Sequence, residues 1–176
     1  MSLTQAAVLA PVPGVGRYLF YAVKDGLAVR EQLQKFSHLV DGLTVLVGLG
    51  PELVDALGAE VPGLHPFVAL DAGGIPVPST PTSLCVWLRA ADRGDLVHLT
   101  RQVEAALSPA FHLEKLIDAF RHGKGPNGHG RDLTGYEDGT ENPSGEKAVH
   151  AAIADGMGEG LDGGSYFAVQ QWVHDR

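Results

Sequence analysis

Short apolar runs of strand length alternate along the chain with longer stretches that repeat apolar residues at helical spacing. Residues 17–23 are rich in aromatic and β-branched side chains, which favours a first strand. Residues 43–49 form a nearly continuous apolar run, which is typical of a strand buried on both faces. Residues 83–90 predict a third strand.

Two amphipathic stretches predict long helices between these strands. The first begins after a cap at Asp25 and the second after a cap at Asp92, because a carboxylate accepts hydrogen bonds from the free N–H groups of a first helical turn. The core-facing side chains recur at spacings of three and four residues: Val29, Leu33, Phe36 and Val40 in the first helix, and Leu96, Leu99, Val103 and Ala106 in the second. Two short helices are also predicted, one from Pro51 to Gly58 and one within residues 146–157.

The segment from His112 to Phe120 fits two structures. Leu113, Leu116, Ile117 and Phe120 have helical spacing, so the local pattern alone favours a helix. A strand here would complete the order β-α-β-β-α-β, which is the ferredoxin-like unit. We therefore predict a strand, and with it an α+β fold whose antiparallel sheet carries its helices on one face.

Three stretches lack apolar periodicity and are predicted to be loops. Residues 59–82 are rich in proline and glycine, and a loop of this length is usually functional or covers another surface. Residues 121–130 form a glycine-rich connector. They lead into residues 131–143, which we name the carboxylate loop because it concentrates acidic and amide side chains.

The carboxylate loop has the residue types of a tight, ordered turn. Gly135 and Gly139 lie on either side of Asp138 and allow positive φ there, so the turn can hold one carboxylate at a fixed angle. Asp-Gly and Asn-Pro are also ordinary turn signals. Spacing alone is therefore compatible with a solvated turn of no special function.

Composition limits the classes of function. The net charge of −8 argues against non-specific binding to nucleic acid or to anionic lipid. The single cysteine, Cys85, lies in an apolar run and is predicted to be a buried small hydrophobe. No segment approaches the ~18 apolar residues that cross a membrane. The first seven residues lack a basic region and a long apolar core, so we expect a cytoplasmic protein.

Common metal and phosphate motifs are absent from the sequence. Lys124 lies between glycines, but the other positions of a phosphate-binding loop are missing. The stretch from Asp138 begins like a calcium loop, yet Pro143 replaces the required glycine and Val149 the bidentate glutamate. The eight histidines show no zinc spacing. We predict no metal site formed by this chain's own residues.

The carboxylate loop resembles the signature of the dye-decolourising (DyP-type) haem peroxidases. The resemblance rests on Gly135-x-x-Asp138-Gly139, on the preceding Arg131-Asp132-Leu133-Thr134 and on the following Thr140-Glu141-Asn142-Pro143. Residues 164–175 are similar to the strand that follows in that family, and the family order also favours a strand at 112–120. The whole thirteen-residue string is far more specific than the short glycine and aspartate pattern alone.

The resemblance implies a haem b peroxidase that reduces hydrogen peroxide and oxidises dyes or other small electron donors. In such an enzyme Asp138 would be the distal acid–base residue, which takes a proton from the inner peroxide oxygen and delivers it to the outer one. Gly139 would let the loop approach the haem closely, and Thr140 and Asn142 would hold it against the haem edge. A homo-oligomer is also expected.

The resemblance covers only about the first half of a family member. Residues 1–160 would form the N-terminal ferredoxin-like domain that carries the loop, and residues 161–176 the start of a truncated second ferredoxin-like domain, including its first strand. The proximal histidine and distal arginine of the family have no counterpart here. The activity of such a chain alone is open, and two alternatives stand beside a peroxidase: an inert, self-associating α+β module, and a small α+β-barrel monooxygenase or ligand-binding protein.

Overall fold

A computed structural model describes residues 5–24 and 29–173 of the chain. Its main sheet has four strands in the order β2-β5-β1-β6, and each neighbouring pair is antiparallel. The strands are β1 (Val15–Val23), β2 (Val45–Leu49), β5 (Leu84–Ala90) and β6 (Phe111–Phe120). Two long helices connect them, α1 (Val29–Ser37) and α3 (Arg93–Leu107). The predicted ferredoxin-like α+β fold is confirmed.

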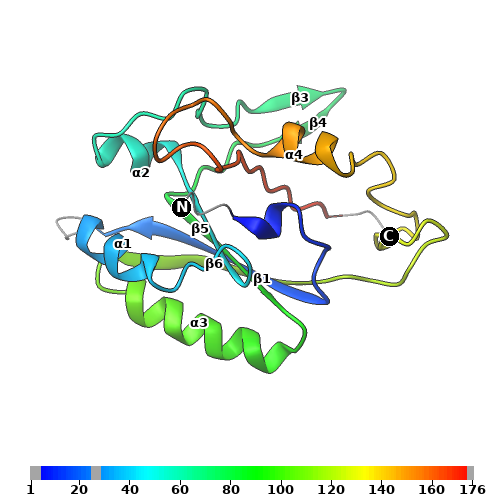
Figure 1. Cartoon of the computed structure of the whole chain (residues 1–176), viewed down its shortest axis with the longest axis horizontal. Coiled ribbons are helices and arrows are strands. Elements are labelled where there is room, and N and C mark those ends of the chain that lie inside the picture. Colours follow the sequence, from blue (N-terminus) through cyan, green and yellow to red (C-terminus); the bar gives the residue numbers. More distant parts are fainter. Residues whose placement is uncertain (1–4, 25–28, 174–176) are drawn as a thin grey trace.

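The core lies between the sheet and these two helices. Helix α3 contacts α1, β1 and β5, and Figure 1 shows it along one face of the sheet. Alternate residues of β1 and β5 point to this face, as the pleat of a strand requires. The fully buried side chains come from both layers: Leu19, Tyr21, Phe36, Leu84, Val86, Leu88, Val103, Leu107 and Phe111.

Strand β6 is a strand although its local pattern favours a helix. It pairs with β1 along its length, and the register shifts between Phe20 and Tyr21 of β1. Leu113 pairs with Tyr21 and Lys115 with Phe20, so Glu114 is the extra residue of a bulge. The bulge places Leu113 and Leu116 on one face, a spacing of three that imitates a helix. The prediction based on element order was right, and the bulge explains why the local pattern pointed elsewhere.

The predicted helix caps and limits are partly confirmed. The Asp92 side chain accepts a 2.6 Å hydrogen bond from the Gly94 amide at the start of α3. Helix α2 (Pro51–Ala56) begins at its proline, and Gly58 follows it with φ +67°. The predicted cap at Asp25 lies outside the described residues. Val40 lies beyond the end of α1, so it reaches the core from the following turn rather than from the helix.

Strand β2 begins two residues later than predicted because of Asp41. One oxygen of its carboxylate accepts hydrogen bonds from the amides of Leu43, Thr44 and Val45 at 2.7–2.9 Å. These amides are turned toward the side chain instead of toward a neighbouring strand. The polar turn therefore extends to Thr44, and sheet pairing starts at Val45.

Residues 59–82, predicted to be an irregular loop, contain a short hairpin. Strands β3 (Leu70–Ala72) and β4 (Ile75–Val77) pair around Gly73 and Gly74, whose φ angles are +65° and +84°. Two positive φ angles are what a tight hairpin turn needs, and a Gly-Gly pair between short apolar runs is a known sequence signal for it. The hairpin lies on the side of the sheet away from α3 (Figure 1).

The predicted strand near Ser165 is wrong for the described residues. Residues 165–173, which we name the tail segment, adopt no strand. A strand needs a neighbour for its N–H and C=O groups, and the described strands do not pair with this segment. It is held by side chains instead: Phe167 stacks on Trp87, and Gln171 accepts a 2.8 Å hydrogen bond from Lys115 Nζ. Helix α4 (Glu146–Ala152), predicted within residues 146–157, precedes it.

None of the described helices combines the length and the apolar character that a bilayer-spanning helix requires.

An ion pair across β1 and β6 gives a test of the register. Arg17 Nε and Nη2 donate to the two Asp118 oxygens at 2.6 and 3.1 Å, and the hydrogen bond from Arg17 lowers the pKa of Asp118. A lowered pKa stabilises the fold above the ordinary aspartate value, near ~3.9, and this contribution is lost as the pH falls through the folded-state pKa.

Asp118→Asn is therefore expected to reduce the free energy of unfolding at pH 7. Because Asp118 is partly exposed, the loss should be about 1 kcal/mol or less. Urea unfolding of both proteins from pH 7 to pH 3 should show the difference shrinking below about pH 4. Asp55→Asn, in α2, is the matched control. An equal difference at both pH values would contradict the pairing.

Candidate functional site

The carboxylate loop (residues 131–143) follows β6 and has turns but no helix or strand, as predicted (the yellow trace at the right of Figure 1). Gly135 and Gly139 both adopt the positive φ expected of them, +94° and +88°. Isolated bridges connect Arg131 to His122 on one side and to Glu137 on the other. The loop is therefore folded back on the connector that precedes it.

Asp132 organises the first turn of the loop. Its Oδ1 accepts hydrogen bonds from the Thr134 hydroxyl at 2.6 Å, the Thr134 amide at 2.9 Å and the Tyr136 amide at 3.2 Å. The hydrogen bond from the Thr134 hydroxyl is the largest cause of a lowered pKa for Asp132. This carboxylate is committed to the structure of the turn.

Glu137 holds the preceding connector. Its carboxylate accepts hydrogen bonds from the Asn127 and His129 amides at 2.9 and 3.0 Å, and from Asn127 Nδ2 at 3.1 Å. Partial removal from water raises the pKa of Glu137, but these hydrogen bonds outweigh that effect and hold the pKa below its ordinary value. Glu137 is thus also occupied by donors from the protein.

Asp138 differs from both neighbouring carboxylates. Its amide donates to the Gly130 carbonyl at 3.0 Å, which fixes the backbone, while its side chain is exposed. Within the part of the chain that the structure describes, no hydrogen bond or ion pair engages the Asp138 carboxylate. The loop therefore presents the Asp138 carboxylate, and the equally exposed Glu141 three residues later, on a backbone that two other carboxylates help to fold.

The three predicted haem-contacting residues lie in the turn directly after Asp138. The Asn142 amide donates to the Gly139 carbonyl at 3.1 Å, so Gly139, Thr140 and Asn142 share one tight turn. A Cβ at Gly139 would lie 2.9 Å from Asn142 Nδ2, and the positive φ adds strain for any other residue. The structure brings all four predicted site residues together. Their contact with haem stays a prediction.

Among residues 5–24 and 29–173, no three histidine, cysteine, aspartate or glutamate side chains converge as metal ligands would. His129 lies near the loop, with Nδ1 3.5 Å from the position of a Cβ on Gly139.

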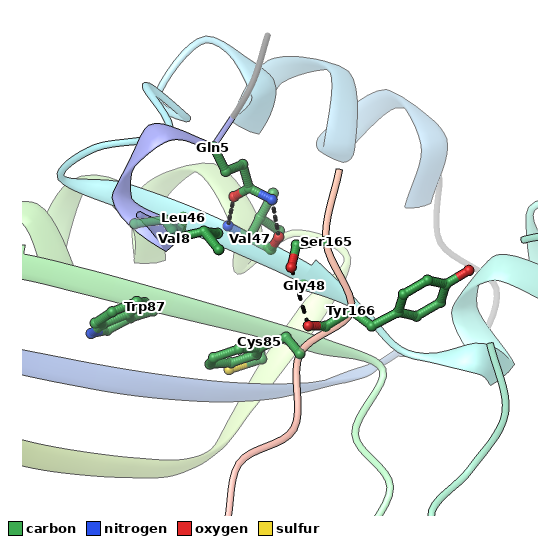
Figure 2. Close-up of a pocket in the computed structure, with 10 residues that line it drawn as sticks. Gln5, Val8, Leu46, Val47, Gly48, Cys85, Trp87, Ser165 and Tyr166 are labelled. Atoms are coloured by element: carbon green, nitrogen blue, oxygen red, sulfur yellow. Dashed lines mark hydrogen bonds between the residues drawn. The ribbon is translucent and has the colours of Figure 1, made fainter. Parts of the chain in front are cut away.

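A separate small cavity lies on the sheet face opposite α3. Figure 2 shows it between β2, β5 and the tail segment. Its volume is about 190 Å³. Its lining is mostly apolar and includes Leu46, Cys85, Trp87 and Phe167. Gln5 lines it too, but its side-chain amide is already hydrogen-bonded to the Val47 backbone. Gln5 Nε2 donates to the Val47 carbonyl at 3.1 Å, and Gln5 Oε1 accepts from the Val47 amide at 3.0 Å. The cavity therefore offers a ligand few free polar groups.

The prediction for Cys85 is confirmed. The side chain is buried, and burial raises the pKa of its thiol to about 12, which keeps it protonated and unreactive. Trp87 beside it stacks between Tyr18 and Phe167, with ring centroids 5.7 and 6.2 Å away. The Arg89 guanidinium lies 5.0 Å from the Trp87 ring centroid. These contacts account for the aromatic side chains by packing alone.

Comparison with known proteins agrees with the family resemblance that the carboxylate loop carries. A family profile described as "Dyp-type peroxidase, C-terminal" matches residues 129–175. The dye-decolorizing peroxidase of Mycobacterium tuberculosis is 32% identical over 96% of this chain, and that of Rhodococcus erythropolis is 30% identical over 96%. The chain belongs to the DyP-type peroxidase family. It spans about half the length of these relatives, 52% in both cases.

Solved DyP-type structures share the fold. A Rhodococcus jostii DypB variant in complex with heme aligns with a TM-score of 0.77 and 26% identity, over 91% of this chain and 56% of its own. The encapsulated DyP-type peroxidase from Mycobacterium smegmatis aligns with a TM-score of 0.74 and 30% identity, over 88% of this chain and 52% of its own. The matched profile includes both the carboxylate loop and the tail segment; the expected domain boundary at residue 160 stays a prediction.

The sequence pattern alone assigned no role to Asp132 or Glu137. The role of Asp132 could have been predicted, because an aspartate two residues before a threonine is a local turn signal. Glu137 could not, because its partners lie eight and ten residues earlier, with no periodic spacing that connects them.

Proposed function

We propose that this chain forms the distal, proton-transferring part of a haem peroxidase. The observation that carries the proposal is the contrast among three nearby carboxylates: Asp132 and Glu137 accept hydrogen bonds from the loop and its connector, whereas the exposed Asp138 carboxylate accepts none from the described residues. A group that first accepts and then delivers a proton must be within reach of the reacting oxygens and free of competing partners. Asp138 meets the second requirement among the described residues and lies on a backbone fixed by the hydrogen bond from its amide to the Gly130 carbonyl, and we propose that it also meets the first.

The residues present fit one side of a haem site. Leu133 and Tyr136 on the loop are each 78% exposed, which provides apolar surface for a macrocycle, and Gly139 lets the backbone approach closely. Haem, when bound, would supply the iron that binds peroxide and takes up the oxidising equivalents. Asp138 would move the proton between the peroxide oxygens. We assign no axial iron ligand among the described residues.

The expected substrates are hydrogen peroxide and a small electron donor such as a dye. This follows from the names of the relatives, which are dye-decolorizing peroxidases, and not from a donor site in this chain. A homo-oligomer and a cytoplasmic location also stay proposals. The encapsulated relative is consistent with assembly, and the exposed apolar residues of the tail segment, Trp172 and Val173 among them, favour a further contact surface.

A chimera tests the proposal. This chain replaces the matching half of the Mycobacterium tuberculosis dye-decolorizing peroxidase, and haemin is titrated into the chimera and into the chain alone. We expect the chimera to develop a Soret band and to oxidise a dye when peroxide is added, and the chain alone to show no turnover. A folded, haem-loaded chimera without peroxidase activity would contradict the proposal. Turnover by the chain alone would instead mean that it supplies an iron ligand itself.

A further inference from the structure

Residues 125–129, which we name the glycine turn, close on themselves beside the carboxylate loop. The Gly125 amide donates to the His129 carbonyl at 2.8 Å, and the Gly128 amide to the Gly125 carbonyl at 3.0 Å. The inward amides of Asn127 and His129 are left for an outside acceptor. Glu137 is that acceptor, and its carboxylate occupies the mouth of the turn.

Gly125 makes room for this carboxylate. A Cβ at position 125 would lie 2.2 Å from Glu137 Cδ and 2.6 Å from its Oε1, far closer than atoms can approach. The φ angle of Gly125 is not positive, so an alanine there would not be strained by its own backbone. The glycine is needed for space alone, and the group that needs the space is the Glu137 side chain.

The glycine turn contacts the carboxylate loop on both sides of Asp138. Glu137 precedes Asp138 in the chain, and the Asp138 amide is bonded to the Gly130 carbonyl directly after the turn. His129 Nδ1 lies against Gly139, the residue that follows Asp138. Any movement of the turn must therefore move the backbone that carries the Asp138 carboxylate.

We propose that Glu137 is a positioning residue that clamps the glycine turn and thereby sets the direction of the Asp138 carboxylate. The clamp rests on the geometry alone; its effect on proton transfer rests on the proposed function. A carboxylate filled by N–H donors is also a poor proton acceptor, and the lowered pKa of Glu137 agrees with this. Glu137 would thus hold the loop without competing with Asp138 for the proton.

A double-mutant cycle on this chain tests the clamp without haem. Glu137→Ala should raise the hydrogen-exchange rates of the Asn127 and His129 amides by about tenfold or more, since both lose a charged acceptor. Gly125→Ala should do the same by displacing the Glu137 side chain. The double variant should exchange no faster than Glu137→Ala, because the clash that Gly125→Ala creates is with Glu137 itself. Glu137→Gln, which keeps one acceptor oxygen, should restore part of the protection.

In the chimera, Glu137→Ala should lower the rate constant for peroxide and leave the KM for the dye and the melting temperature unchanged. A variant with a slower reaction with peroxide, a raised KM for the dye and a lowered melting temperature would mean that Glu137 has only a general structural role. Unchanged exchange at Asn127 and His129, or additive effects of the two substitutions, would overturn the clamp. If the cycle behaves as expected but Asp138→Asn leaves activity intact, the clamp stands and the proposed function fails.

Discussion

Asp138→Asn is expected to lower the rate constant for peroxide reduction in the chimera by about 10²- to 10⁴-fold, the usual contribution of general acid–base catalysis. The asparagine amide has nearly the shape of the carboxylate but cannot accept the proton of the inner peroxide oxygen. The Asp138 side chain has no partner among the described residues, so the substitution should break no contact in this half. Haem content and melting temperature should be unchanged. Stopped-flow mixing with peroxide measures the rate, and the Soret band the haem content.

Glu141→Gln is the matched control for this experiment. It removes the same charge from the same loop three positions later, and Glu141, like Asp138, is exposed. We expect its rate to stay within about twofold of the parent, because a surface charge at this distance acts only through a screened field. Equal losses in both variants would indicate a general charge effect. A near-parental rate for Asp138→Asn would remove Asp138 from the mechanism.

The fold could be predicted wherever local pattern and tertiary pairing agree. The apolar runs at 17–23 and 83–90 became β1 and β5, and the aspartate before residue 93 caps α3 as expected. Pattern failed where a partner decides the structure. The bulge at Glu114 breaks the period of β6, and it can only be recognised once β1 lies beside it. The tail segment has strand-forming residues, but none of the described strands pairs with its backbone, so composition alone gave the wrong prediction.

The candidate site divides in the same way. Asp138 and the glycines around it came from a resemblance carried by consecutive residues, which a sequence preserves. The role of Glu137 depends on a turn that returns from residues 125–129, and the need for Gly125 depends on where that side chain ends. Relations of this kind have no fixed spacing. They become visible only when the backbone is placed.

Phe111→Ala is expected to reduce the free energy of unfolding by about 3–5 kcal/mol, the usual loss when a buried phenyl ring leaves a cavity. Phe111 begins β6, pairs with Val23 and is fully buried in the core. Such a loss is a large part of the total stability of a small domain, about 5–15 kcal/mol. In urea the unfolding midpoint should fall by ~1 M or more. Far-ultraviolet circular dichroism follows the transition.

Phe120→Ala is the control, and it also decides between the two structures that the sequence allowed for this segment. Phe120 ends the same strand and is 66% exposed, so its truncation should change the free energy of unfolding by about 0.5 kcal/mol or less. In a helix, Leu113, Leu116, Ile117 and Phe120 would share the buried face. Phe111, about two and a half turns away, would point to solvent. A helix therefore predicts the opposite ranking, with Phe120→Ala the costly change, and that ranking would contradict the sheet pairing of β6 with β1.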